Sequence, residues 1–293
     1  MKIACGWLYS LSTFGYPPNF ADTLKGITLA AKWGFDAFEM EAIGEDNLLD
    51  LYAHRKELKA HIDSQGLTLA NFVPVIRSTV SLDPEIQKKS LALFELGVDL
   101  AAELDAKLVM TDSYEVPIEY TSESPAFDPI HYGKGYQVKI TPEFSWDRVW
   151  DNMISVMGIC TNICEKRGLR LGMEMRLAET VNNTDAFLRL YDAVRNPYLG
   201  VVFDTAHLHA QKEILPISVE KLKDRIFLIH ASDNDSATNA HLSLGNGNIH
   251  WKSVIAALQK HHFDGYYVLD IGDCPDLEQA YHDSQQYLEN LPA

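Results

Sequence analysis

The chain has 293 residues, 46% hydrophobic and 23% charged, a composition typical of globular proteins. Its 41 acidic residues outnumber the 25 basic ones, and the net charge of −16 disfavours binding to nucleic acid. No stretch approaches the roughly 20 apolar residues of a membrane span, and the N-terminal residues MKIACGWLYS lack the features of a signal peptide. The 4 cysteines do not suggest a disulfide framework. We therefore expect a cytoplasmic protein without nucleic-acid or membrane partners.

Eight short apolar runs recur along the chain and have the length and composition of β-strands. They are rich in β-branched or aromatic residues, which favour strands. The runs cover residues 2–7, 36–41, 68–74, 107–113, 170–175, 199–204, 225–233 and 265–272.

Helical patterns lie between these runs. Apolar side chains recur at spacings of three, four and seven residues in 47–65, in 84–105 and from Leu277 to Leu291. Ser145 is a predicted helix N-cap, because its hydroxyl can accept a hydrogen bond from the first turn. Glycines expected to end helices are Gly34, Gly66 and Gly168.

The alternation of strands and helices predicts parallel strands joined by crossover helices. Eight such units in 293 residues fit a closed (β/α)8 barrel, so we expect an α/β fold in which residues 1–293 form a single TIM-barrel domain. A doubly wound open sheet is the alternative. It is disfavoured because no G-x-G-x-x-G sequence follows the first strand to bind a nucleotide.

Residues 114–144 interrupt the alternation after the fourth strand. This insertion shows no helical period, and loops of its length are usually functional or disordered. Its prolines and aromatic residues favour an ordered lid over the barrel mouth. The alternative is a contact between the subunits of a homo-oligomer.

Four strands in succession end in a residue that can bind a metal ion or transfer a proton. In a TIM barrel these strand ends meet at one mouth, where catalytic groups lie. Carboxylates that converge there repel one another unless a cation neutralises them. Three oxygen donors and one imidazole suit Mn²⁺, Mg²⁺ or Co²⁺ better than Zn²⁺, and Mn²⁺ is our first choice. The four residues are Glu174, Asp204, His230 and Asp270.

The segments that contain these residues resemble motifs of the xylose-isomerase-like barrel superfamily. They read GMEMR, FDTAHLHA, LIHASDN and HLSLGNGNIHW, and the last is similar to a His-x-x-x-Gly-x-Gly turn that leads into a helix with a tryptophan. The superfamily contains sugar isomerases and epimerases, inosose dehydratases and abasic-site endonucleases. The resemblance covers essentially the whole chain.

Resemblance to the ketose epimerases implies that the four strand-end residues bind one divalent metal ion. It also implies that His207 holds a substrate oxygen, whereas His241 resembles a residue that lines the site or binds additional metal in the endonucleases. The last ligand is usually glutamate, which in the epimerases also transfers protons, so the shorter Asp270 is a departure. Ser236 stands where some epimerases carry a substrate-binding arginine, and Asn239 where the endonucleases carry a metal-binding aspartate.

Further candidates for substrate binding are Trp7, Glu39 and Arg176. Trp7 could stack on the C–H face of a sugar, and the alternative for this indole is a place in the hydrophobic core. Glu39 and Glu41 point to one face of the second strand, where they line the mouth or form salt bridges.

These residues suit proton abstraction beside a sugar carbonyl, with Glu174 as the base and Asp270 as its partner across the ring. Return of the proton to the same carbon gives epimerisation, return to the neighbouring carbon gives isomerisation, and loss of a β-hydroxyl gives dehydration. We therefore expect a metal-dependent sugar or cyclitol isomerase or epimerase that acts through an enediolate. An inosose-type dehydratase is the alternative. An inactive sugar-binding barrel, suggested by the shortened Asp270, is an alternative of another class.

The expected substrate is not phosphorylated. In barrels of this type, phosphate binds after the seventh and eighth strands. Here those loops, ASDNDSATNAHLSLGNGN and IGDCPDLEQ, contain several acidic residues and no lysine or arginine.

Overall fold

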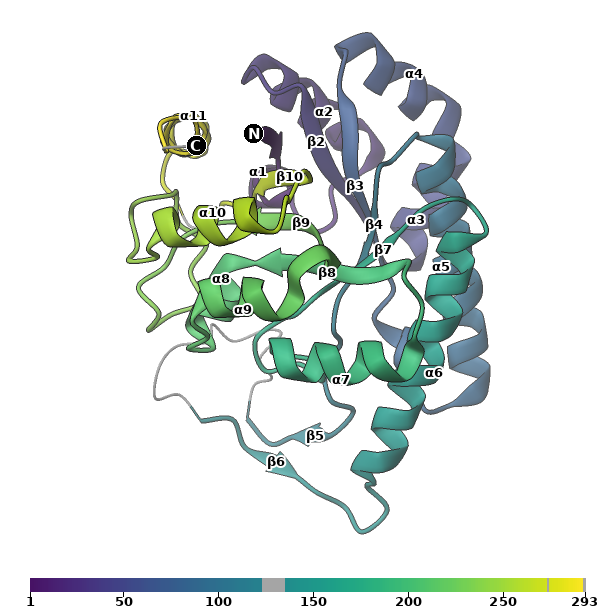
Figure 1. The fold of residues 1–293 in the computed structure, drawn as a ribbon. Coiled ribbons are helices and arrows are strands. Elements are labelled where there is room, and N and C mark those ends of the chain that lie inside the picture. The colour runs from purple at the N-terminus through teal and green to yellow at the C-terminus, as the bar shows by residue number, and fades with distance from the viewer. Residues whose placement is uncertain (123–134, 273, 292–293) are drawn as a thin grey trace.

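The computed structural model describes residues 1–122, 135–272 and 274–291. Eight parallel strands close into a barrel in the order β1-β10-β9-β8-β7-β4-β3-β2, and helices surround them (Figure 1). All eight runs predicted from the sequence are therefore confirmed as barrel strands. They are β1 (Lys2–Cys5), β2 (Ala37–Ile43), β3 (Thr68–Val75), β4 (Val109–Thr111), β7 (Leu171–Glu174), β8 (Leu199–Asp204), β9 (Ile226–Ala231) and β10 (Tyr266–Leu269).

The helices follow the strands as crossover connections, and two short 3₁₀ turns, Arg77–Val80 and Lys223–Arg225, accompany them. None of the described helices is long and apolar enough to cross a membrane. The helices are α1 (Leu8–Phe14), α2 (Phe20–Lys32), α3 (Gly44–Ala53), α4 (Arg55–Gln65), α5 (Pro84–Glu103), α6 (Trp146–Glu165), α7 (Thr184–Val194), α8 (Thr205–Ala210), α9 (Leu215–Leu222), α10 (Trp251–Lys260) and α11 (Leu277–Glu289).

Several helix ends follow from single residues. Ser145 caps α6 as predicted, because its Oγ accepts a hydrogen bond from the backbone N–H of Arg148 at 3.3 Å. Gly66 ends α4 with a φ of 69°, which costs a glycine little. The predicted helix 47–65 is two helices, which meet at His54, whose ring stacks on Phe20 with centroids 4.5 Å apart.

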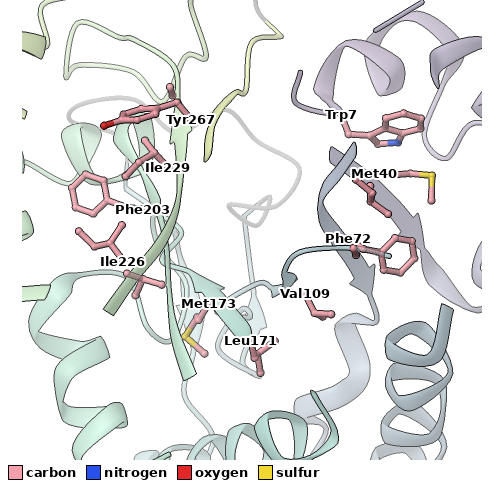
Figure 2. Close-up of a cluster of buried hydrophobic side chains, with 14 of the residues drawn as sticks. Trp7, Met40, Phe72, Val109, Leu171, Met173, Phe203, Ile226, Ile229 and Tyr267 are labelled. Carbon is pink, nitrogen blue, oxygen red and sulfur yellow. The ribbon is translucent and has the colours of Figure 1, made fainter. Parts of the chain in front are cut away.

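The strands separate two apolar layers. Figure 2 shows the larger layer, in which side chains such as Phe72, Leu171 and Phe203 pack between the strands and the helices. Alternate positions of the strands contribute the smaller layer, whose members contact one another from around the barrel and therefore fill its interior. The smaller layer includes Ala4, Ala37, Ala70, Leu108, Met110, Val202, Leu228 and Val268.

The insertion after β4 contains a two-stranded antiparallel ribbon. It pairs β5 (Glu119–Tyr120) with β6 (Val138–Lys139), and it lies near the start of α6 at the lower edge of Figure 1. Residues 123–134 lie outside the described part of the chain, so a lid at 114–144 stays a prediction.

Candidate active site

The side-chain alternation of the strands carries the candidate residues into the barrel mouth. Val202, Leu228 and Val268 belong to the interior apolar layer, and two positions further along each chain come Asp204, His230 and Asp270. Residues two apart on a strand point to the same face. The barrel interior is therefore apolar at one end and polar at the carboxyl ends of the strands, where Glu174 ends β7.

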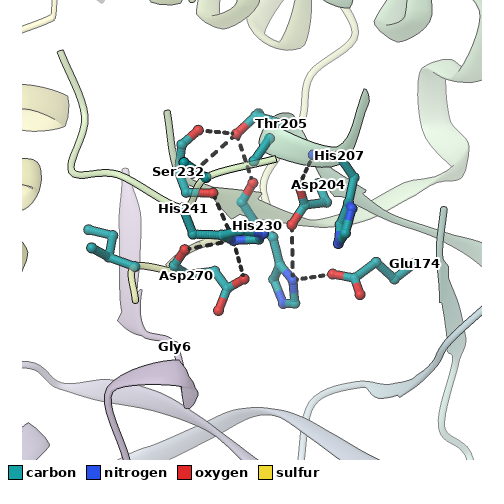
Figure 3. A network of polar contacts seen from close by, with 12 residues as sticks. Gly6, Glu174, Asp204, Thr205, His207, His230, Ser232, His241 and Asp270 are labelled. Carbon is teal, nitrogen blue, oxygen red and sulfur yellow. Dashed lines mark hydrogen bonds and ion pairs between the residues drawn. The ribbon is translucent and has the colours of Figure 1, made fainter. Parts of the chain in front are cut away.

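Glu174, Asp204 and His230 form a compact buried group (Figure 3). The Nδ1 atom of His230 lies 2.6 Å from Oε1 of Glu174 and 3.7 Å from Oδ2 of Asp204. One potential ligand atom from each residue lies within 4.8 Å of the others. The structure thus brings together three of the four predicted metal ligands.

These residues fit a divalent cation. Asp204 is fully buried, and its Oδ2 atom has no hydrogen-bond partner among the described residues. Its other oxygen, Oδ1, accepts a hydrogen bond from the backbone N–H of His207 at 2.7 Å and so caps α8. A buried carboxylate oxygen without a partner is costly, and an ion held between carboxylates and an imidazole would remove that cost.

Burial and neighbouring charges shift the two carboxyl groups in opposite directions. Burial raises the pKa of Asp204 to about 7, with His241 acting against it. Burial also opposes ionisation of Glu174, but His230 outweighs it and holds the pKa of Glu174 below its ordinary value. The Glu174 side chain is therefore favoured as a carboxylate, the form that can accept a proton.

The fourth predicted ligand, Asp270, contacts His241 instead of the compact group. Its Oδ2 atom lies 3.0 Å from Nδ1 of His241, which also lies 3.1 Å from the Asp270 carbonyl oxygen and 3.2 Å from Oγ of Ser232 (Figure 3). Burial lowers the pKa of His241, but Asp270 more than compensates and raises it to about 9. The negative charge of Asp270 is therefore balanced by the neighbouring ring of His241.

His207 is held as a neutral hydrogen-bond donor. Its Nδ1 atom accepts a hydrogen bond from the backbone N–H of Leu177 at 3.3 Å. Burial lowers the pKa of His207 to about 3, which keeps the ring neutral. A neutral imidazole that accepts at Nδ1 carries its proton on Nε2. His207 also lies close to Asp204 and His241 in a second group of potential metal ligands. In the tautomer described here, its Nε2 atom donates a hydrogen bond instead of binding a metal ion.

The structure adds Asp112 and Glu179 to the predicted site residues. The guanidinium of Arg176 lies 3.3 Å from Asp112, 3.6 Å from Glu174 and 3.8 Å from Glu179. Its Nε atom is buried without a hydrogen-bond partner among the described residues. Asp112 follows β4 as the other candidates follow their strands, so its position was a usable signal. Glu179 lies in an irregular segment that no pattern marked.

The predicted pocket residue Trp7 lies in the hydrophobic core. Its indole is fully buried, with ring centroids 6.0 Å from Tyr9 and 6.3 Å from Phe38 (Figure 2). This placement corrects the expectation that Trp7 stacks on a sugar, because an indole packed on all sides offers no free face. Glu39 is buried at the mouth, 2.8 Å from Nε2 of His230.

The His-x-x-x-Gly-x-Gly turn is tied to Asp233. The carboxylate of this fully buried residue accepts hydrogen bonds from the backbone N–H of Gly245 at 3.0 Å and from Nε1 of Trp251 at 3.0 Å. A Cβ atom at Gly247 would collide with Asp233 and with the carbonyl of Asn234. The glycine and the tryptophan of the motif therefore serve one purpose, to fix the loop that carries His241.

The loop after β8 brings a cation to the loop after β9. Nζ of Lys212 donates to the backbone carbonyl of Ser236 and to its Oγ at 2.5 Å. The sequence argument on phosphate considered only the charges within the loops after the seventh and eighth strands. It therefore missed this lysine, which belongs to the preceding connection.

Comparison with known proteins agrees with the barrel fold. A family model described as xylose isomerase-like TIM barrel matches residues 27–291. The chain belongs to this family. A structure of 3-keto-D-glucoside 4-epimerase from E. coli has a TM-score of 0.75 at 17% identity and covers 99% of both chains, which shows the same fold.

Two relatives differ in the reaction that their names give. A probable ketose 3-epimerase from Synechocystis sp. is 23% identical and covers 93% of this family member and 86% of its own chain. An inosose dehydratase from Salmonella agona is 25% identical, over 46% of this chain and 50% of its own.

Proposed function

We propose that this family member is a divalent-metal-dependent isomerase or epimerase of a sugar or cyclitol. The observation that carries the proposal is the Oδ2 atom of Asp204, which has no hydrogen-bond partner among the described residues and is fully buried beside Glu174 and His230 at the carboxyl ends of the barrel strands. The names of the epimerase relatives support the substrate class.

Glu174, Asp204 and His230 would hold the ion, and Asp270 would complete the set from the opposite side. A divalent ion in this position supplies positive charge that stabilises an enediolate. Mn²⁺ is the proposed ion because the donors are carboxylate oxygens and one imidazole. Mg²⁺ and Co²⁺ suit the same donors, and Zn²⁺ is less favoured.

The protein groups around the ion divide the remaining work. Glu174 accepts the proton from the carbon beside the carbonyl, because the guanidinium of Arg176, 3.6 Å away, favours its carboxylate form. His207 donates a hydrogen bond from Nε2 to a substrate oxygen. Arg176, whose Nε has no hydrogen-bond partner among the described residues, binds a further oxygen. Asp270 and His241 face the substrate from the other side of the mouth and return the proton.

Solvent exchange tests the proposed reaction before its product is known. The purified protein is incubated with Mn²⁺ in D₂O together with a panel of ketoses and inososes, and NMR follows the loss of carbon-bound protons. Enediolate chemistry predicts exchange at one carbon for at least one compound of the panel. Absence of exchange with every compound, in a protein that binds the ion, would favour an inactive sugar-binding barrel.

Dehydration is the second candidate function, favoured by the inosose dehydratase relative. The same base would remove the proton, but a β-hydroxyl would then leave as water. The panel separates the two reactions, because dehydration loses water and produces an unsaturated or diketo product, whereas epimerisation changes the composition only by the exchanged hydrogen.

A further inference from the structure

Glu39 contacts His230 on the side of the ring away from Glu174. Its Oε2 atom lies 2.8 Å from Nε2 of His230, while Oε1 of Glu174 lies 2.6 Å from Nδ1. The side chains of Glu39 and His230 are only 2% and 3% exposed. The imidazole therefore bridges the carboxylate of Glu39 on β2 and the carboxylates of Glu174 on β7 and Asp204 on β8.

Glu39 is itself held by Asn71 of the neighbouring strand. Nδ2 of Asn71 donates to the same Oε2 atom at 2.5 Å, and Asn71 is fully buried. Glu39 and Asn71 are register partners in the pairing of β2 with β3. Two strands thus fix the carboxylate at the point where it meets His230.

A neutral imidazole has one N–H donor and one lone pair, and the partner of one nitrogen decides which atom has which. Carboxylates lie beside both nitrogens and can only accept, so in this structure each nitrogen carries a proton. A divalent ion bound beside Glu174 and Asp204 would displace the proton on Nδ1, whereas Glu39 would retain the one on Nε2.

We propose that Glu39 is a positioning residue for the metal centre. It holds His230 in the tautomer and orientation that present Nδ1 to the ion, and Asn71 holds Glu39. The inference rests on the proposed metal centre and replaces the sequence-based assignment of Glu39 to substrate binding. A carboxylate that accepts hydrogen bonds from two buried protein donors is poorly placed to receive a sugar hydroxyl.

Metal affinity separates a positioning residue from a substrate ligand. The full chain is stripped of metal, and Mn²⁺ binding is measured by electron paramagnetic resonance for wild type, Glu39→Ala and Glu39→Gln. We expect Glu39→Ala to weaken Mn²⁺ binding by about 10- to 100-fold, the range known for such supporting groups. Glu39→Gln should lose less, because its amide oxygen can still accept from Nε2, and its near-identical shape protects the fold.

Glu41→Gln is the matched control. Glu41 lies two positions along β2 on the same face of the strand, and no hydrogen bond or ion pair joins it to His230 among the described residues. If loss of any carboxyl group from this face were enough, Mn²⁺ binding would weaken equally in Glu39→Gln and Glu41→Gln. The positioning role requires a larger loss for Glu39→Gln.

Two further measurements test the hydrogen-bonded chain. Asn71→Ala should weaken Mn²⁺ binding in the wild-type background but not in Glu39→Ala, because Asn71 acts through Glu39. Nitrogen-15 NMR of the Mg²⁺-loaded protein should show the proton of His230 on Nε2 in wild type and a mixture of tautomers in Glu39→Ala.

The outcomes distinguish this inference from the proposed function. Unchanged Mn²⁺ affinity in Glu39→Ala together with a raised KM would assign Glu39 to the substrate and overturn the positioning role, while the metal centre would stand. A wild-type protein that binds no Mn²⁺, Mg²⁺, Co²⁺ or Zn²⁺ would overturn both.

Discussion

Two carboxylate–histidine groups lie at the same mouth of the barrel, and they differ in how their charges are balanced. On one side, Glu39, Glu174 and Asp204 surround the single ring of His230. On the other side, His241 contacts the carboxylate of Asp270, a backbone carbonyl and a serine hydroxyl.

The difference shows where a cation is needed. Even a protonated His230 together with the Arg176 guanidinium, 3.6 Å from Glu174, supplies two positive charges against three carboxylates, and Oδ2 of Asp204 remains without a hydrogen bond in the described structure. The Asp270–His241 pair can balance its own charge. Residue types alone do not distinguish these groups, because each contains an imidazole and at least one acid at the end of a parallel strand.

The largest effect is expected for Asp204→Asn, which removes the carboxylate whose Oδ2 atom has no hydrogen-bond partner among the described residues. We expect Mn²⁺ affinity to fall by about 10²- to 10³-fold, comparable to the 3–5 kcal/mol cost of breaking a buried ion pair. The asparagine oxygen can still accept from the N–H of His207, so the cap of α8 is kept. Metal content by mass spectrometry and thermal unfolding of the metal-free protein check both statements. An Asp204→Asn protein with full metal content would contradict the proposed centre.

Glu174→Gln tests the base within the same group. The amide fills the space beside His230 but cannot accept a proton from carbon, so solvent exchange should fall by a factor on the order of 10². Substrate binding should persist in weakened form, which calorimetry can measure. Exchange at the wild-type rate would place the base elsewhere, first of all at Asp270.

Asp270 variants sharpen the contrast with the second group. Because Asp270 is already satisfied by His241, we expect Asp270→Asn to weaken Mn²⁺ binding only about tenfold, less than Asp204→Asn. Asp270→Glu restores the length that is usual in the epimerases and should strengthen Mn²⁺ binding by a few-fold. The same electron paramagnetic resonance titration measures both variants. If Asp270→Asn loses the ion as completely as Asp204→Asn, the two groups are not distinct.

The barrel could be predicted from local patterns, because each strand is an apolar run and a helical period marks the segments 47–65, 84–105 and 277–291. The strand-end rule also located Glu174, Asp204, His230 and Asp270, since it depends only on chain order and side-chain alternation. Among these, the structure groups Asp270 with His241 and the other three together. That grouping depends on side-chain length and packing, which the pattern does not contain.

The residues that sequence reasoning placed wrongly or missed depend on contacts across the fold. Trp7 follows a strand as the site residues do, but α1 and α2 bury its ring against Tyr9. Asn71 lies in the middle of an apolar run, and its role emerges only when β2 and β3 pair. Lys212 reaches Ser236 from another loop. Such pairs are far apart in the sequence and leave no periodic signal.

The smallest expected effect is the preference for an unphosphorylated sugar over its phosphate ester. It depends on the loops after β9 and β10, which lie beside Asp270 and His241. Asp276 caps the start of α11 with its own carboxylate, which occupies a helix terminus where barrels commonly hold an anion. The carboxylate of Asp233 accepts a hydrogen bond from the backbone N–H of Gly245. Lys212 brings a positive charge to this loop through its contact with Ser236. A dianion would still meet like charges that cost on the order of 1 kcal/mol each. We therefore expect kcat/KM for an unphosphorylated sugar to exceed that for its phosphate ester by about tenfold. Kinetics on one sugar and its ester, repeated with Lys212→Ala, measure the difference, and a preference for the ester that Lys212→Ala abolishes would show that this lysine recruits phosphate.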